Sequence, residues 1–218
     1  MTEARELALA LMMADLCGYT ALTETHGALQ ASETVLHFVR LVEASLEPGV
    51  RIVDSIGDSV FCAGEDTLAV VRTAVRLREA VCGEEGFPRI STGVHRGPVV
   101  ERQGRLFGAP INLTARLTSH AAGDQILCSA QVAEAIAASG FGCSPIGEQH
   151  FRNVAHPVAL YELVHADDEH AAFAVDPVCR MQVEAVHAAA TVAHGGKTYR
   201  FCSKHCAQTF SASPELYT

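Results

Sequence analysis

The sequence predicts a mixed α+β fold, and three observations support that prediction. Residues 8–15 form a short apolar run of the kind that makes a buried strand. Residues 50–54 and 59–63 are two β-type runs separated by a four-residue turn, which is typical of a hairpin. Residues 66–82 carry apolar side chains at helical spacing. Antiparallel pairing together with helices on one face indicates an α+β domain.

The remaining elements follow in chain order. Residues 20–47 have a helical periodicity that we expect to break near Gly27. Residues 88–100 are strand-like. Pro110 fits the first turn of a helix that runs to about Ser119, because proline is tolerated in a first turn. After it we expect a strand at 125–128, a helix at 130–138 and a strand-rich end that closes at 164.

The composition changes near residue 165 and divides the chain in two. Residues 166–174 are small or polar, which is typical of a linker. We therefore expect a first domain over residues 1–165, a linker over 166–174 and a compact second module over 175–218.

Composition and charge argue against several classes of protein. The chain has 218 residues, 49% of them apolar, which suits one large domain with a small module. No apolar run reaches the roughly 20 residues of a membrane span, and we expect no signal peptide and a cytoplasmic location. Residues 1–173 hold 12 basic and 22 acidic side chains. We therefore expect no nucleic-acid partner and no membrane insertion.

The eight cysteines fall into two groups. Five occur singly in apolar segments, where we expect buried thiols rather than disulfides; they are Cys17, Cys62, Cys82, Cys128 and Cys143. The other three, Cys179, Cys202 and Cys206, lie together in the tail. Cys202 and Cys206 are one helical turn apart, so three thiolates can converge on Zn²⁺ or Cu⁺.

Two acidic residues stand where a strand ends or turns. Asp15 closes the first apolar run and is followed by a loop that contains Gly18, and Asp58 lies in the hairpin turn. Carboxylate oxygens suit Mg²⁺ or Mn²⁺, and the backbone amides of such a loop can hold phosphate. Taken alone, an aspartate followed by a glycine more often marks a simple turn.

Five segments occur in the order and spacing of class III adenylate/guanylate cyclase catalytic domains. They are MADLCGYTAL, IVDSIGDSVFCAG, GVHRGPVV, LFGAPINLTARL and FRNVAHPVALYEL. Residues 7–165 thus resemble this family, and five linked motifs are far more specific than any one of them. The resemblance implies a ferredoxin-like core that acts as a head-to-tail homodimer, with a nucleoside triphosphate as substrate at the interface.

The resemblance also implies roles for individual residues. Asp15 and Asp58 match the two aspartates that hold two Mg²⁺ or Mn²⁺ ions per active site. Asn112 and Arg116, which share a helix face, match the ribose-orienting Asn and the transition-state Arg. In the dimer each site takes the aspartates from one chain and the Asn and Arg from the other. The phosphate-binding loop comprises Leu16, Cys17, Gly18, Tyr19 and Thr20.

Two positions depart from the family's pattern. Where adenylate cyclases of the family carry a base-reading lysine, this chain has Asp54, and the partner aspartate is replaced by Arg105. No lysine precedes Lys197 in the chain. Asp54 can accept from an exocyclic amine while Arg105 donates to a ring atom, which adenine satisfies and guanine or cytosine can also satisfy. The alternative is an Asp54–Arg105 salt bridge with no role in base recognition.

The tail resembles the YHS domain, a small treble-clef-like metal module. DPVCRMQV, GGKTYRFCSKHC and FSASPELY carry this resemblance over residues 176–217. A module of about 45 residues has little core, and a bound metal is one standard remedy. A zinc site needs a fourth ligand besides the thiolates; His205 is the nearest candidate, and Asp176, His187 and His194 are others. The alternative is a metal-free module with ordinary thiols.

Three functions fit these features. The first is a homodimeric nucleotidyl cyclase that makes a 3′,5′-cyclic nucleotide and pyrophosphate, with ATP favoured and a tail that tunes activity to metal or redox state. The second is a catalytically inactive, nucleotide-binding pseudo-cyclase. The third is a metal sensor or carrier that uses the cyclase fold as a dimerisation scaffold. The joint presence of Asp15, Asp58, Asn112 and Arg116 favours the first, since a dead scaffold needs none of them.

Overall fold

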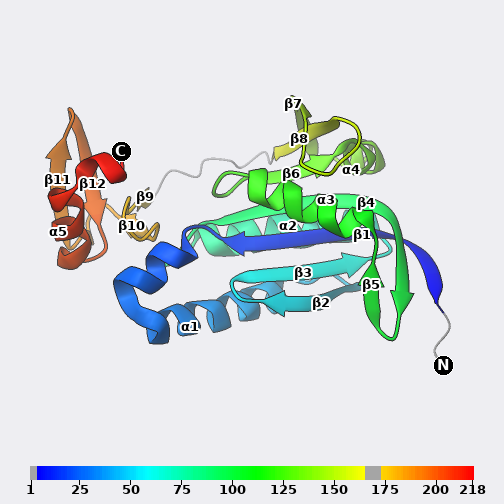
Figure 1. Ribbon diagram of the computed structural model, residues 1–218, viewed down its shortest axis with the longest axis horizontal. Helices are drawn as coiled ribbons and strands as arrows, with labels where there is room; N and C mark the ends of the chain where they lie inside the picture. Colours follow the sequence, from blue (N-terminus) through cyan, green and yellow to red (C-terminus); the bar gives the residue numbers. More distant parts are fainter. Residues whose placement is uncertain (1–3, 165–172) are drawn as a thin grey trace.

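A computed structural model describes residues 4–164 and 173–218 (Figure 1). The first of these two parts is built on one sheet. Its strands are β1 (Arg5–Leu16), β2 (Val50–Ile56), β3 (Ser59–Gly64), β4 (Ile90–Arg102), β5 (Arg105–Phe107), β6 (Ile126–Ser129), β7 (Gly142–Gln149) and β8 (Val158–Val164). The strand order is β2-β3-β1-β4-β6-β8-β7, with β5 paired to β4. The pairs are antiparallel except for β4 and β6, which run parallel.

Strand β1 lies in the middle of the sheet, and its sequence shows why. It is apolar at almost every position because both of its faces are covered. Alternate residues point to opposite faces. Met12 and Leu16 face one hydrophobic cluster, and Leu9 and Leu11 face another. Asp15 shares the second face with Met13 and lies where the strand ends.

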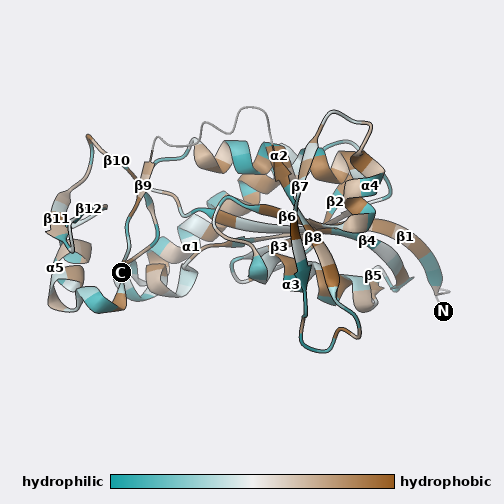
Figure 2. Cartoon of the chain, turned by 90° about the horizontal axis from the view of Figure 1, so that it is seen from above, coloured by the Kyte–Doolittle hydropathy of each residue, from teal (hydrophilic) through white to brown (hydrophobic). Residues whose placement is uncertain are grey.

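Helices cover both faces of the sheet. They are α1 (Tyr19–Ser45), α2 (Thr67–Cys82), α3 (Ala109–His120) and α4 (Ala130–Ile136). Helices α1, α2 and α4 share the main core, to which they contribute Phe38, Val70 and Val132. Helix α3 packs on the opposite face of the sheet (Figure 2). Its Leu117 belongs to the same hydrophobic cluster as Leu127 of β6. The α+β class is confirmed, whereas the expectation that the helices share one face is wrong. Alternate residues of one strand build two cores, and each core needs a cover.

Helix α1 consists of two segments joined at a glycine, as the sequence predicts. Gly27 has φ 83° and ψ 162°, which is outside the helical region. Phe38 and Val42, in the second segment, pack into the main core. Leu22 in the first segment and Ala31 just beyond the kink belong to a different hydrophobic cluster, which they share with the C-terminal module. The kink therefore lets one helix serve two cores.

The C-terminal module contains two small hairpin-like sheets and a helix. Its elements are β9 (Phe173–Val175), β10 (Gln182–Glu184), β11 (Ala190–His194), β12 (Lys197–Phe201), α5 (Lys204–Ala212) and the 3₁₀ turn η1 (Pro214–Leu216). Strand β9 pairs with β10, and β11 pairs with β12. The module lies beside the start of α1 (Figure 1). The linker predicted at 166–174 lies largely outside the described residues, and residues 173 and 174 belong to β9.

The module is hydrogen-bonded to the first domain through Gln182. The Gly86 N–H donates to the Gln182 carbonyl at 2.9 Å, and the Gln182 N–H donates to the Phe87 carbonyl at 3.0 Å. The buried Gln182 amide also donates to the carbonyls of Val81 at 3.1 Å and Phe87 at 3.2 Å. A buried amide with its hydrogen bonds satisfied fixes orientation as well as contact. The two domains are therefore docked in a defined arrangement.

The other predicted elements of the first domain are found within a few residues of their expected bounds, and β5 is an additional short strand. Over the described residues no helix has the length and apolar character needed to span a bilayer. The cytoplasmic location expected from the sequence stays a prediction.

Candidate functional site

Asp15 and Asp58 lie side by side where β1 and β3 begin to separate. Asp15 is opposite Ser59 in the β1–β3 register, and Asp58 directly precedes Ser59 in the turn. The Ser59 hydroxyl donates a hydrogen bond to Asp15 Oδ1. The Leu16 N–H donates to the Asp58 carbonyl at 3.3 Å, which ties the hairpin turn to the end of β1. The antiparallel pairing of the strands therefore brings the two carboxylates together.

The electrostatics of this pair favour a bound cation. Burial raises the pKa of Asp15; the Ser59 hydrogen bond opposes this shift, and the nearby charge of Asp58 adds to it. Burial also raises the pKa of Asp58. Two partly desolvated carboxylates that repel each other are stabilised by a shared or adjacent divalent ion. The donor set thus fits Mg²⁺ or Mn²⁺.

The predicted phosphate loop forms the turn between β1 and α1. Gly18 has φ 78°, a left-handed conformation that favours glycine. Two of the loop's amides are engaged within the chain: Leu16 donates to Asp58, and Cys17 donates to the Arg89 carbonyl at 2.8 Å. The amides of Gly18, Tyr19 and Thr20 stand at the N-terminus of α1, where helical N–H groups have no partner within the helix. These three backbone amides are therefore the ones available to bind an anion.

Asn112 and Arg116 are both exposed on one face of α3, as their spacing predicts. The opposite face of α3 lies close against the sheet: the Thr118 hydroxyl donates to the Met13 carbonyl at 3.1 Å. A Cβ on Gly93 would lie 2.5 Å from the Thr118 nitrogen, so only glycine admits this approach. Within the described ranges no hydrogen bond or ion pair joins Asn112 or Arg116 to the two aspartates. Within one chain, the aspartate pair and the Asn112–Arg116 pair are therefore separate.

Asp54 and Arg105 line one cavity of about 410 Å³ on the α3 face of the sheet. Its wall is otherwise largely apolar and includes Met13 and Phe61, and Ser59, the partner of Asp15, also lines it. The side chain of Asp54 accepts the N–H of the next residue at 2.9 Å. No ion pair between Asp54 and Arg105 is present in the part of the chain that the structure describes. Both side chains are therefore available to a ligand in the cavity.

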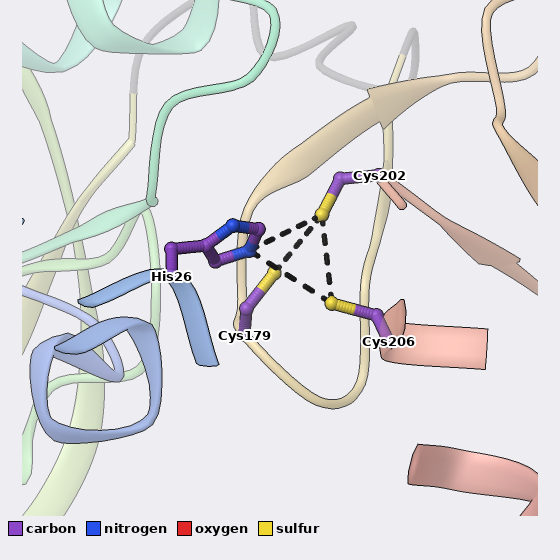
Figure 3. Close-up of side chains that lie close together, drawn as sticks. All are labelled: His26, Cys179, Cys202 and Cys206. Carbon is purple, nitrogen blue, oxygen red and sulfur yellow. Dashed lines mark hydrogen bonds between the residues drawn. The ribbon is translucent and has the colours of Figure 1, made fainter. Parts of the chain in front are cut away.

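Three cysteines and one histidine form a second cluster (Figure 3). The Sγ atoms of Cys179 and Cys202 are 3.4 Å apart, and those of Cys202 and Cys206 are 3.7 Å apart. The Nε2 atom of His26 lies 3.5 Å from Cys202 Sγ and 3.8 Å from Cys206 Sγ. The four ligand atoms all lie within 4.8 Å of one another. His26 comes from α1 of the first domain, and sequence analysis did not identify it because no spacing motif links it to the cysteines.

The residues considered as fourth ligands have other positions. His205 is exposed on α5, although it directly precedes the buried Cys206. The buried carboxylate of Asp176 accepts backbone N–H groups, including those of Cys179 at 3.4 Å and Cys202 at 2.9 Å. His187 binds Glu85 at 2.8 Å. The ring of His194 packs edge-on against Phe210.

Comparison with known families accounts for both parts of the chain. The model of the adenylate and guanylate cyclase catalytic domain matches residues 2–165, and the YHS domain model matches residues 174–218. A copper-transporting P-type ATPase from Rhizobium leguminosarum is 45% identical over 53 residues, which are 23% of this chain and 6% of that protein.

Curated relatives of the first domain include bacterial adenylate cyclases. A pH-sensitive adenylate cyclase from Mycobacterium tuberculosis is 31% identical over 154 residues, which cover 69% of this chain and 39% of the relative. An adenylate cyclase from Streptomyces coelicolor is 34% identical over 127 residues, covering 58% of this chain and 33% of the relative. The chain thus spans 39% or less of the length of these two relatives.

Solved structures have the same fold. The adenylyl cyclase CyaB from P. aeruginosa has a TM-score of 0.67 at 21% identity, over 77% of this chain and 99% of that one. An adenylate/guanylate cyclase/hydrolase from Silicibacter pomeroyi has a TM-score of 0.68 at 23% identity, over 75% of this chain and 99% of that one. The ferredoxin-like cyclase fold is confirmed. The chain therefore belongs to the class III adenylate and guanylate cyclase family and carries a YHS domain after its catalytic domain.

Proposed function

We propose that the protein is a nucleotidyl cyclase that converts a nucleoside triphosphate to a 3′,5′-cyclic nucleotide and pyrophosphate. The observation that carries the proposal is the placement of Asp15 and Asp58. Two partly buried carboxylates adjoin the open N-terminus of α1 and a cavity large enough for a base. Carboxylates bind the metal ions, helix amides bind phosphate, and the cavity holds the base, so the three parts of the substrate have separate sites.

Two Mg²⁺ or Mn²⁺ ions held by Asp15 and Asp58 would supply charge neutralisation for attack of the 3′-hydroxyl on the α-phosphorus. The protein's own groups do the rest. Asn112 orients the ribose, so that the hydroxyl lies in line with the departing pyrophosphate. The guanidinium of Arg116 stabilises the negative charge that develops on the phosphorus oxygens.

We propose that the active unit is a head-to-tail homodimer. Asn112 and Arg116 are exposed on α3, and among the described residues neither forms a hydrogen bond or ion pair with the aspartates of its own chain, so a second chain is needed to complete each site. Ile56 and Phe107 support this arrangement. They are 71% and 51% exposed, and both stand at the cavity that holds Asp54 and Arg105. Large apolar side chains left in solvent beside a binding cavity are typical of an interface.

We propose ATP as the substrate, with Asp54 and Arg105 reading its base. Both residues line the cavity, and a carboxylate acceptor and a guanidinium donor in one cavity can complement the amino group and ring nitrogen of adenine. Guanine and cytosine remain competitors on hydrogen bonding alone. The presence of adenylate cyclases among the relatives supports ATP as the substrate. We also propose that metal bound by the YHS thiols regulates this activity.

The decisive experiment incubates the purified chain with each of the four nucleoside triphosphates and Mn²⁺, and identifies products by mass spectrometry. We expect a cyclic nucleotide, formed fastest from ATP. Asp58→Asn should yield none. Asp66→Asn is a matched control because Asp66 caps α2 by accepting the Leu68 N–H at 2.9 Å, and asparagine caps equally well. Absence of any cyclic product from a folded dimer that binds nucleotide would support the pseudo-cyclase instead.

A further inference from the structure

The cysteine and histidine cluster has the dimensions of a tetrahedral zinc site. Zinc binds thiolate sulfur at about 2.3 Å and imidazole nitrogen at about 2.0–2.1 Å. At tetrahedral angles these bonds place two sulfurs about 3.8 Å apart and a sulfur and a nitrogen about 3.5 Å apart. The observed separations are 3.4 and 3.7 Å between sulfurs and 3.5 and 3.8 Å between sulfur and nitrogen. A disulfide would need about 2.05 Å, so the thiols are placed for a shared ion.

The surroundings of the cluster hold the ligands in place. Asp176 is fully buried and accepts the N–H groups of Val178, Cys179 and Cys202, so it fixes the backbone on both sides of the cluster. The Ser203 hydroxyl caps α5 by accepting the Cys206 N–H at 3.1 Å. Each thiol-bearing residue is thus oriented by a hydrogen bond to its own backbone. Such support is the usual second layer around a protein metal site.

We propose that His26, Cys179, Cys202 and Cys206 bind one zinc ion, and that this ion fastens the cyclase domain to the YHS domain. Three ligands come from the YHS domain, and the fourth comes from α1 of the catalytic domain. Four ligands of the S₃N type close the coordination sphere, which is the pattern of structural rather than catalytic zinc. An imidazole in the set also favours zinc over Cu⁺, which soft sulfur ligands alone select.

Two of the proposed ligands, His26 and Cys179, are connected to the predicted phosphate loop. His26 is on the first segment of α1, which starts at the loop, and Arg180 directly follows the ligand Cys179. The side chain of Arg180 lies against the loop: a Cβ on Gly18 would be 2.2 Å from Arg180 Cγ. A zinc ion bound to His26 and Cys179 would therefore fix the positions of both α1 and the Arg180 side chain relative to the loop. Resting on the proposed cyclase function, this makes the metal a determinant of phosphate binding.

The test uses the full chain and matched histidine variants. His26→Ala removes the proposed ligand, and His205→Ala removes an exposed histidine next to Cys206. We expect one zinc per wild-type and His205→Ala chain by mass spectrometry of the metal. Loss of an outer partner of a metal ligand weakens binding about 10–100-fold, so His26→Ala should weaken zinc binding at least that much in competition with a chelator. X-ray absorption should find three sulfurs and one imidazole, with the imidazole signal lost in His26→Ala alone.

Two further measurements keep the result independent of cyclase activity and of misfolding. Cobalt substitution should give the intense visible bands of tetrahedral Co²⁺ in wild type, altered in His26→Ala and unchanged in His205→Ala. Hydrogen exchange at residues 16–22 should quicken when wild type is stripped of zinc and recover on reloading. Unchanged zinc affinity and imidazole signal in a folded His26→Ala chain would overturn the proposal, as would a purely sulfur-bound Cu⁺ ion.

Discussion

At the scale of single residues, the proposed active site is a place where function and stability conflict. Asp15 and Asp58 are partly buried, close together and raised in pKa, so both carboxylates are less stable charged in the folded chain than in water. A metal ion offsets this cost. Without metal, the two charged carboxylates lower the stability of the folded state, and a variant that lacks one of these charges would be more stable.

Asp58→Asn should therefore abolish cyclisation yet stabilise the metal-free chain at neutral pH. With its folded pKa raised above the ordinary 3.8, Asp58 keeps its proton longer in the folded state. Wild-type stability then falls as pH rises from about 3.8 through the folded pKa. Asp58 is partly exposed, so screening by solvent keeps this gain in stability small. Urea unfolding with a chelator should show that the variant is more stable than wild type at pH 7, and this difference should disappear well below pH 3.8, where Asp58 is protonated in both the folded and the unfolded state. A difference that does not change with pH would contradict this origin.

A second prediction at this scale concerns Asp54, which we propose reads the base of the substrate. Loss of a hydrogen-bond partner costs about 1–3 kcal/mol, or roughly one to two decades of selectivity. Asp54→Ala should accordingly lower the preference of kcat/KM for one triphosphate over the others more than it lowers turnover on the least favoured one. Competition assays with mixed triphosphates measure this. If the nucleotide profile of a folded, active Asp54→Ala chain matches that of wild type, Asp54 does not read the base.

At the scale of elements, α1 connects the two proposed sites. Its first turn borders the phosphate loop, its first segment carries His26 and packs on the YHS domain, and its second segment packs on the sheet. The kink at Gly27 makes this possible, since a straight helix presents one apolar stripe to one partner. A change at one end of α1 is therefore expected to reach both domains.

Gly18→Ala tests this connection through stability. The left-handed backbone at Gly18 costs an alanine about 1–2 kcal/mol, and the clash with Arg180 adds to that. Gly140→Ala is the matched control, because Gly140 has φ 87° but nothing within 4 Å of the added Cβ. Unfolding free energies should show a larger loss for Gly18→Ala. Adding Arg180→Ala removes the Cγ but keeps the Arg180 Cβ, which is 2.8 Å from the added Cβ, so it should reduce the excess over the control without abolishing it. If the excess is unchanged, the Arg180 side chain does not lie against the loop.

At the scale of the whole molecule, the proposed catalytic groups lie on separate surfaces of the chain. The acidic pair lies at the end of the central strand, and Asn112 and Arg116 lie on the outer face of α3. In the proposed two-fold dimer each set would meet its complement twice, which would give two equivalent sites. The YHS domain is docked beside α1 and contributes three cysteines to the proposed zinc site.

Mixing inactive chains tests the composite site. Asp15→Asn and Arg116→Ala should each be inactive alone. Equal amounts that exchange subunits at random should recover about a quarter of wild-type activity, since half the dimers are mixed and each has one intact site. Asp15→Asn mixed with Asp58→Asn should recover none, because every site then has a damaged acidic pair. Failure of the first mixture despite proven subunit exchange would place the site within one chain. Recovery in the control would show that Asp15 and Asp58 act from different chains, which would contradict the acidic pair.

The sequence by itself determined what depends on neighbouring residues. The strand–turn–strand around Asp58, the break of α1 at Gly27 and the helix carrying Asn112 and Arg116 follow from periodicity, turn chemistry and backbone freedom over a few positions. The motifs further identified the catalytic family. Tertiary packing alone decided which distant residues meet. It put α3 on the face opposite the other helices, gathered Asp54 and Arg105 around one cavity, and brought His26 rather than His205 to the three thiols. Such contacts depend on how whole faces are buried against one another, and no local pattern encodes that choice.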